Sequence, residues 1–254
     1  MKKYILLSLL FLSVFVVSLL AHLPAALVVK HAPLPAQLAI EGVSGTLWQG
    51  QASQVNWQRR SLGPLSWQWQ PSRLIEGKLA AQLRLSGKES DYALAGRGEV
   101  GLSLSGAYAQ NLLASLPASA VIKQLPLPPL PVELGGQVEI NIRHWQYQPP
   151  YCEAGEATLV WNSDRIASPL GDLELGPVIA DVRCQQQQIN LQGEQSSDQV
   201  VGGFAVEVDP NGRYNASGWF KPQAAFPPAM NAQLPWLGNP DGKGRYQFQQ
   251  QGAL

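Results

Sequence analysis

Few residues in this chain have the type and spacing that enzymatic chemistry needs. His144 is the one histidine beyond the N-terminal region, so a histidine-based mechanism has a single candidate. Catalysis of that kind requires a nucleophile or a carboxylate at hydrogen-bond distance from the imidazole. His144 stands beside Trp145 at the end of an alternating segment. A partly exposed structural histidine is the simpler interpretation.

Paired carboxylates and a glycine motif offer no stronger site. Glu153 with Glu156, and Asp172 with Glu174, could each share a site, but no His, Arg or metal-ligand set accompanies them. Residues 96–101, GRGEVG, match G-x-G-x-x-G. A dinucleotide fingerprint opens a helix, whereas the residues after this motif alternate as a strand. We therefore predict no catalytic residue, no cofactor and no metal site.

The two cysteines, Cys152 and Cys184, predict one disulfide bond. An isolated pair usually forms a bridge in an oxidising compartment. The alternative is two unrelated buried thiols. Two cysteines with one distant histidine do not make a zinc-ligand set.

Four tryptophans lie close together in the first part of the chain: Trp48, Trp57, Trp67 and Trp69. Core packing is the first interpretation, because aromatic side chains dominate core burial. A position at a membrane interface is the second. The third is that they anchor a protein partner, since Trp is enriched in binding hot spots.

The N-terminus indicates the compartment. Lys2 and Lys3 precede an uncharged apolar run from Tyr4 to Ala21, and the next segment, up to Val29, is again apolar. About 17–25 apolar residues can span a membrane, and lysines before the span predict a cytoplasmic N-terminus. A cleaved signal peptide is the alternative, but the small residue needed three positions before a cleavage site is missing. Either way, the body of the protein is exported.

Composition excludes one class of partner. The 254 residues carry 18 basic and 18 acidic side chains, so the formal net charge is zero. A nucleic-acid-binding protein needs clustered Lys and Arg, and the sequence has no such cluster. We do not expect a small-molecule ligand. The 24 glycines and 20 prolines favour many turns over long helices.

Alternation of apolar and polar residues predicts a mainly β body. Period-2 alternation indicates strands with one buried face and one solvated face, which is typical of curved antiparallel sheets. It is clearest in Lys78–Ser86, Glu99–Ser105, Gln137–Arg143 and Phe204–Val208, and a turn at 209–212 predicts a hairpin with the following segment. Ala107–Lys123 lacks the alternation and suits a short amphipathic helix.

Prolines suggest how the chain is divided. Four prolines in the segment 124–131 predict a stiff, extended connector. The predicted order is a cytoplasmic start and transmembrane anchor at 1–29, a spacer at 30–37, a first β-rich half at 38–123 that ends in the short helix, the connector, and a second β-rich half with the disulfide at 132–254.

Three stretches resemble the type II secretion system protein N family, also called general secretion pathway protein N. They are the start Lys2–Val29, the segment 42–50, GVSGTLWQG, and the segment 62–77, LGPLSWQWQPSRLIEG. The order of anchor, β-rich body, proline-rich middle and paired cysteines also fits. The G-T-L-W-x-G element is shared with larger inner-membrane β-groove proteins that handle lipid, so by itself it does not separate the two families.

The resemblance implies a single-pass protein of the bacterial inner membrane, with a cytoplasmic N-terminus and a periplasmic body. It implies a non-enzymatic part in the export of folded proteins, with partners among the inner-membrane platform or the outer-membrane secretin. The main alternative is an anchored lipid-handling groove protein. An open concave sheet with a continuous apolar inner surface would favour that alternative, and a filled core would favour an adaptor. A periplasmic hydrolase would need a polar pocket around His144.

Overall fold

The computed structural model describes residues 2–31, 35–58, 60–87, 93–122, 131–163 and 165–253. Within these ranges one antiparallel sheet of 13 strands contains most of the body. Each of its strands pairs with the strands of the same sheet that come before and after it in the chain. The strands of this sheet are β1 (Leu38–Gly45), β2 (Gln49–Trp57), β3 (Arg60–Trp69), β4 (Leu79–Leu85), β5 (Ala95–Ser103), β6 (Gly106–Pro117), β8 (Gln137–Gln146), β9 (Ala154–Asn162), β12 (Pro177–Gln185), β13 (Gln188–Ser196), β14 (Val200–Val208), β15 (Arg213–Pro222) and β16 (Tyr246–Ala253).

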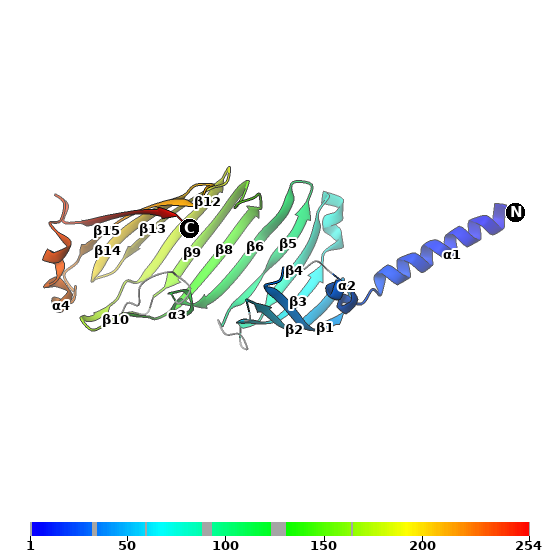
Figure 1. Ribbon diagram of the computed structural model, residues 1–254, viewed down its shortest axis with the longest axis horizontal. Coiled ribbons are helices and arrows are strands. Elements are labelled where there is room, and N and C mark those ends of the chain that lie inside the picture. Colours follow the sequence, from blue (N-terminus) through cyan, green and yellow to red (C-terminus); the bar gives the residue numbers. More distant parts are fainter. Residues whose placement is uncertain are drawn as a thin grey trace.

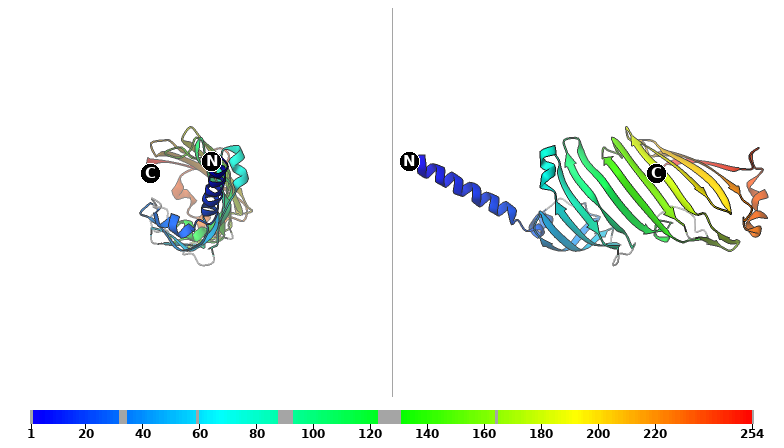
Figure 2. Two further views of the ribbon diagram at one scale, coloured as in Figure 1. Left: turned by 90° about the vertical axis from the view of Figure 1, so that its right-hand side faces the viewer. Right: turned by 180° about the vertical axis from the view of Figure 1, so that it is seen from behind.

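The sheet is strongly curved and open along one side. Seen from its end it has the shape of a C, and the free strands β1 and β16 lie at its two edges (Figures 1 and 2). Strand twist and coiling produce such curvature in long antiparallel sheets. The prediction of a mainly β, antiparallel, curved body is confirmed.

The alternating segments form strands as predicted. Lys78–Ser86 contains β4, Gln137–Arg143 lies within β8, and Phe204–Val208 ends β14. The turn after Val208 joins β14 to β15 as a hairpin. The GRGEVG segment lies inside β5, so its interpretation as a strand is also confirmed.

The helix predicted over Ala107–Lys123 is wrong for most of its length. Gly106–Pro117 is β6, and only Ala118–Ile122 forms a helix, α3. β6 is paired on both sides, with β5 and with β8, and its register to β5 shifts beside Asn111, whose φ is +49°. This bulge moves the apolar side chains from odd to even positions, which hides the period of two in the sequence.

Short helices flank the sheet. They are α2 (Ala25–His31), η1 (Pro71–Glu76), α4 (Pro228–Asn231) and η3 (Leu234–Leu237). Ahead of them, α1 (Lys2–Ala21) projects away from the end of the sheet that carries β1 (Figure 1). None of the helices in the described part of the chain combines the length and the apolar character that crossing a membrane requires.

The strands before and after the proline-rich segment belong to one sheet, because β6 pairs directly with β8. The predicted connector itself, apart from Pro131, lies outside the described residues, as do residues 32–34 of the spacer. A small second sheet contains β7 (Glu133–Leu134), β10 (Ile166–Ser168) and β11 (Gly171–Leu173).

Candidate interaction surfaces

One face of the sheet is apolar across most of its strands. Residues that pair directly across neighbouring antiparallel strands share a face. The register therefore joins apolar side chains into two continuous rows, which we call the concave face. The first row is Leu112, Ile142, Ala157, Val182, Leu191 and Val206, and the second is Ala114, Ile140, Leu159, Ala180, Phe204 and Phe248 with two glycines between them.

The opposite face is polar and forms the outside of the curve. Its matching row is polar except for Ala205, and its members are Asn141, Thr158, Asp181, Gln192, Ala205, Ser217 and Gln249. η1 packs on this face, where Arg73 contacts Glu99, and in the view from behind it lies in front of the sheet (Figure 2, right). The apolar rows consequently line the inside of the C, while the polar face surrounds it.

The concave face is partly accessible along its length. Ala157 and Ala180 are buried, but Leu159, Leu191 and Phe204 in the same rows are only half-buried. Farther along the inner side, Leu102 is 55% exposed, and Phe248 near the free edge is 58% exposed. In the part of the chain that the structure describes, these apolar side chains are therefore not packed beneath a second layer as they would be in a filled core.

A buried carboxylate ties the outer helix η1 to the sheet. Glu99, which is 2% exposed, accepts hydrogen bonds from Arg73 Nε at 3.3 Å and Nη2 at 3.0 Å, and from the Tyr108 hydroxyl at 2.9 Å. Arg73 also donates to Glu76 at 2.9 Å, and the Lys78 ammonium lies 5.6 Å from the centre of the Tyr108 ring. A buried carboxylate needs such partners, because an unpaired charge is costly to bury. The cluster therefore fixes η1 on the neighbouring strands β5 and β6.

Burial, together with the hydrogen bond to Glu99, raises the pKa of Tyr108 from 10 to about 12. The folded state thus holds this proton more tightly than the unfolded state does, so the contribution to stability is complete below pH 10 and is lost as the pH rises towards 12. We expect the free energy of unfolding to fall less steeply across this range in Tyr108→Phe than in the wild type. Urea unfolding of both proteins at a series of pH values measures the difference, and identical slopes would contradict the prediction.

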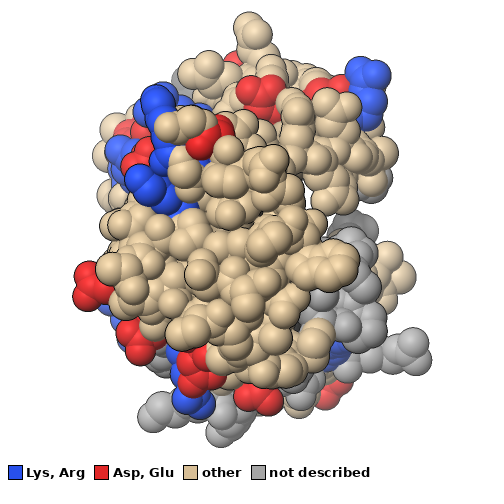
Figure 3. All heavy atoms as spheres, turned by 90° about the vertical axis from the view of Figure 1, so that its left-hand side faces the viewer, with Lys and Arg blue, Asp and Glu red and all other residues tan. Residues whose placement is uncertain are grey.

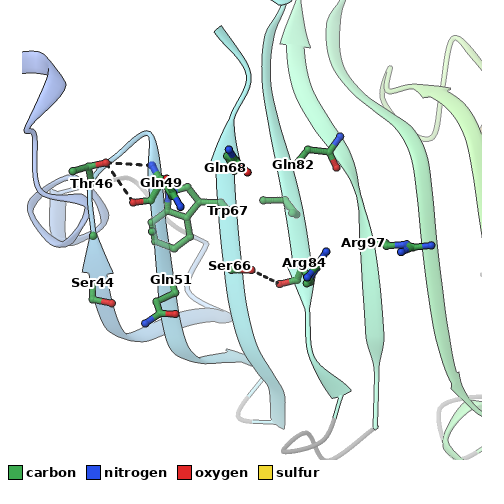
Figure 4. Close-up of a pocket in the computed structure, with 13 residues that line it drawn as sticks. Ser44, Thr46, Gln49, Gln51, Ser66, Trp67, Gln68, Gln82, Arg84 and Arg97 are labelled. Carbon is green, nitrogen blue, oxygen red and sulfur yellow. Dashed lines mark hydrogen bonds between the residues drawn. The ribbon is translucent and has the colours of Figure 1, made fainter. Parts of the chain in front are cut away.

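A depression of about 870 Å³ lies on the polar face over β1 to β5 (Figure 4). Its side chains are mainly amides and hydroxyls, with Arg84 and Arg97 directly opposite each other on neighbouring strands. Ser66 Oγ donates to the carbonyl of Arg84 at 3.5 Å. No carboxylate or imidazole is among its lining residues within the described ranges. The surface can donate hydrogen bonds to a partner, but it lacks a general base.

The four tryptophans occupy the same end of the sheet. Trp48 and Trp69 meet edge to face with ring centres 5.5 Å apart. Trp67 covers Gly50, where a Cβ atom would collide with the ring, and its Nε1 donates to Leu47 O at 3.2 Å. Trp57, by contrast, is 42% exposed at the end of β2. Packing accounts for three of the rings, and Trp57 offers the most accessible surface to a partner.

The two cysteines are joined, as predicted. The Cys152–Cys184 disulfide links the loop before β9 to the end of β12, and both residues are fully buried. Trp145 lies next to it, over Gly155, and its Nε1 donates to Tyr151 O at 3.2 Å. The bridge therefore ties the β8–β9 loop to β12 at one end of the sheet.

The structure places His144 beside one of the candidate carboxylates, Glu156, on the surface of the sheet. His144 is exposed in β8, opposite Gln110 and Glu156. Glu156 pairs with Arg143 at 3.5 Å, and Asp172 pairs with Arg165 at 3.3 Å, both on exposed surface. Within the described ranges, no group of three or more potential metal-binding side chains is found.

Sequence reasoning missed two features of the surface. It did not identify the buried Glu99 cluster, because Glu99 alternates in sequence like any outward polar residue of a strand. It also missed the apolar end formed by α4 and η3, where Trp236 is 86% exposed and Leu237 is 64% exposed. Figure 3 shows this end with a broad uncharged centre and charged side chains mostly towards its borders. In the sequence, this apolar end is indicated only by the run of apolar residues and prolines before Gly238.

Comparisons with known proteins point to one family. The model of the family described as "Type II secretion system (T2SS), protein N" matches residues 36–249. The chain is 44% identical to the type II secretion system protein N of Vibrio cholerae and 32% identical to that of Aeromonas hydrophila, with all of both chains covered in each case. A third relative of the same name, from Pectobacterium carotovorum, is 26% identical over 93% of this chain and 92% of its own. No solved structure matches the chain. Since the family model covers most of the sequence and the relatives match from end to end, the chain belongs to the type II secretion system protein N family.

Proposed function

We propose that this protein is a non-enzymatic component of type II secretion that assists the export of folded proteins from the periplasm. In this proposal residues 1–29 anchor it in the inner membrane with the N-terminus in the cytoplasm, and the curved sheet lies in the periplasm. Lys2, Lys3 and the long apolar run after them support the anchor. Family membership supports the role in secretion, because the relatives carry that name over the full length.

The observation that carries the role in docking is the outer face of the sheet. It is rich in amide and hydroxyl side chains, among them Gln49, Gln51 and Gln68 beside the tryptophan cluster. Such groups form hydrogen bonds with a partner at a small desolvation cost compared with charged groups. The proposed partners are other type II secretion components, either the inner-membrane platform or the outer-membrane secretin.

Gene deletion with complementation tests this proposal. We expect cells without the protein to retain folded exoproteins in the periplasm, and we expect the wild-type gene to restore their release. A photo-crosslinking residue at position 51, exposed in the polar depression of the outer face, should then join the protein to another secretion component. The same residue at position 207, on the outer face of β14, serves as the matched control. Normal secretion in the deletion strain would refute the proposal.

The concave face favours a second candidate function, the binding of lipid acyl chains. Its two rows are apolar from β6 to β14, and many of their side chains are only half-buried. Covering them with an acyl chain would remove apolar surface from water, at about 25 cal/mol per Å². This is the open, apolar inner surface that favours a lipid-handling protein over an adaptor with a filled core.

A fluorescent fatty acid tests the second candidate directly. We expect saturable binding of the probe to the full-length protein in a mild detergent, with competition by phospholipid. Binding that is linear in protein concentration and insensitive to competitor would reject a lipid site and leave the docking role unaffected.

A further inference from the structure

We propose that β16 is a dimerisation edge, at which two copies of this chain join by antiparallel pairing of their β16 strands, centred on Gln249. The proposal goes beyond the role in secretion and does not depend on it. It rests on the free backbone groups of this strand, on the absence of edge protection, and on the symmetry of its sequence.

The hydrogen-bond pattern identifies which backbone groups of β16 point outward. Asp209 N donates to Arg213 O at 2.9 Å, and Gln223 N donates to Gln199 O at 2.8 Å. These bonds place the odd-numbered residues of β15 in hydrogen-bonded pairs with β14. Its even-numbered residues therefore bond to β16, because the two kinds of pair alternate along an antiparallel ladder.

The register between β15 and β16 then assigns every residue of the edge. Even positions of β16 lie opposite even positions of β15, as in the pair Gly218 and Phe248. Their backbone groups face β15. The N–H and C=O groups of Gln247, Gln249, Gln251 and Ala253 consequently point away from the sheet. All four residues are exposed.

Among the described residues, this edge shows none of the features that normally prevent edge-to-edge pairing. Proteins protect free strands with charged residues, prolines, bulges or a covering element. β16, with the sequence YQFQQQGA, has no charge and no proline, and its register to β15 is unbroken. β1, at the other edge, carries Glu41, and the chain before it packs against its end through α2 and the Pro24–Thr46 bridge.

The sequence of β16 is complementary to itself in one register. With a two-fold axis at Gln249, Gln247 of one copy lies opposite Gln251 of the other, and Gln249 lies opposite its own counterpart. Each of these outward residues exchanges both backbone hydrogen bonds, which gives about six bonds across the axis. Glutamine amides are donors and acceptors at once, so identical side chains can pair across the strands.

Charged residues near the edge are already paired within one copy. The Asp241 carboxylate accepts from Arg245 Nε at 2.8 Å and from the backbone N–H groups of Lys243 and Arg245 at 2.9 Å. Arg213, at the other end of the strand, is paired with Asp209 at 2.8 Å. A second copy therefore approaches an edge without an uncompensated like charge from these arginines.

The dimer would be one continuous sheet with both concave faces on the same side. β1 and α1 lie at the end of each sheet away from β16, so the two N-terminal helices would leave from the far ends of the pair (Figure 1). With both helices in one membrane, the long axis of the pair would lie along the membrane surface.

Single cysteine variants test the register. The chain has no free cysteine in its described part, and the native bridge is buried, so an introduced thiol can be followed alone. In the centred register the two copies of position 249 lie roughly 5.5 Å apart at Cα, within reach of a disulfide. Copies of position 247 are about 14–15 Å apart at Cα, which is beyond reach.

We expect oxidised full-length Gln249→Cys in detergent to run as a covalent dimer on a non-reducing gel. Gln247→Cys and Gln251→Cys should each run as an uncrosslinked single chain on the gel, and they should crosslink when the two variants are mixed. Equal crosslinking at all three positions, or no crosslinking at 249, would overturn the proposal.

A backbone variant provides an independent test. Gln249→Pro removes an N–H that the native ladder does not use, so an edge strand tolerates it. Sedimentation of the full-length protein should show a dimer for the wild type and for Gln249→Ala, but a monomer for Gln249→Pro with an unchanged melting temperature. A monomeric wild type, or a dimeric Gln249→Pro, would refute the dimer. A monomeric wild type whose Gln249→Pro variant secretes poorly would assign the edge to a strand of another protein.

Discussion

Replacing both Cys152 and Cys184 with serine should lower the free energy of unfolding by roughly 3–4 kcal/mol. The bridge closes a loop with a sequence separation of 32 residues, and the chain-entropy model gives a loss of this size for such a loop. The two residues are fully buried, so two hydroxyls would also replace the bridge in an apolar site. Urea unfolding of the full-length protein, followed by tryptophan fluorescence, measures the difference.

A reducing agent provides the matched control for this prediction. It should lower the stability of the wild type to about that of the double variant and leave the double variant unchanged. The end of the sheet near the β8–β9 loop should become more accessible first, because Gln186 and Gln187 donate backbone hydrogen bonds to Glu153 and Cys152 there. Equal stability of the oxidised wild type and the double variant would show that the bridge does not constrain the fold.

Leu191→Glu should abolish the function of the concave face, whereas Gln192→Glu should have little effect. These are consecutive residues of β13, so their side chains lie on opposite faces of the sheet. Leu191 is half-buried in the first apolar row, and Gln192 is exposed on the polar face. A carboxylate on the inside is costly to cover with an acyl chain, because burying an unpaired charge is strongly unfavourable. The same charge on the outside remains in water.

The measurements for this pair are binding of the fluorescent fatty acid and release of exoproteins from cells. If the concave face is used in secretion, the Leu191→Glu protein loses fatty-acid binding. Cells that carry it release no more exoprotein than the deletion strain. Melting temperature and protein level must match between the variants, and Leu191→Gln supplies a neutral polar substitution at the same site. Normal lipid binding and normal secretion by a folded Leu191→Glu protein would place the function on the outer face instead.

Alternation along single strands was enough to predict much of the fold. Segments such as Lys78–Ser86 and Gln137–Arg143 carry their apolar residues at every second position, and that period follows from strand geometry alone. The disulfide was predictable because the chain has two cysteines and an isolated pair usually forms one bridge. The motif G-T-L-W-x-G and the stretches around it were specific enough to indicate the family.

The strand β6 could not be predicted, because its conformation depends on its neighbours. Alanine and leucine favour helices locally, and the bulge at Asn111 disrupts the period of two. Pairing with β5 on one side and β8 on the other overrides that local preference. The Glu99 cluster was hidden for a related reason, since its partner Arg73 lies 26 residues away in a helix that folds back onto the sheet.

The sequence by itself determined that this is a β-rich member of a secretion family, with two-faced strands and one disulfide. Period, composition and motifs are local properties, and they can be read without coordinates. Only the tertiary structure decided which face lies inside the curve, that the apolar face is left partly open, and that β16 ends the sheet with unpaired backbone groups. Curvature and edges arise from the pairing of all the strands together, and no single segment of the chain encodes them.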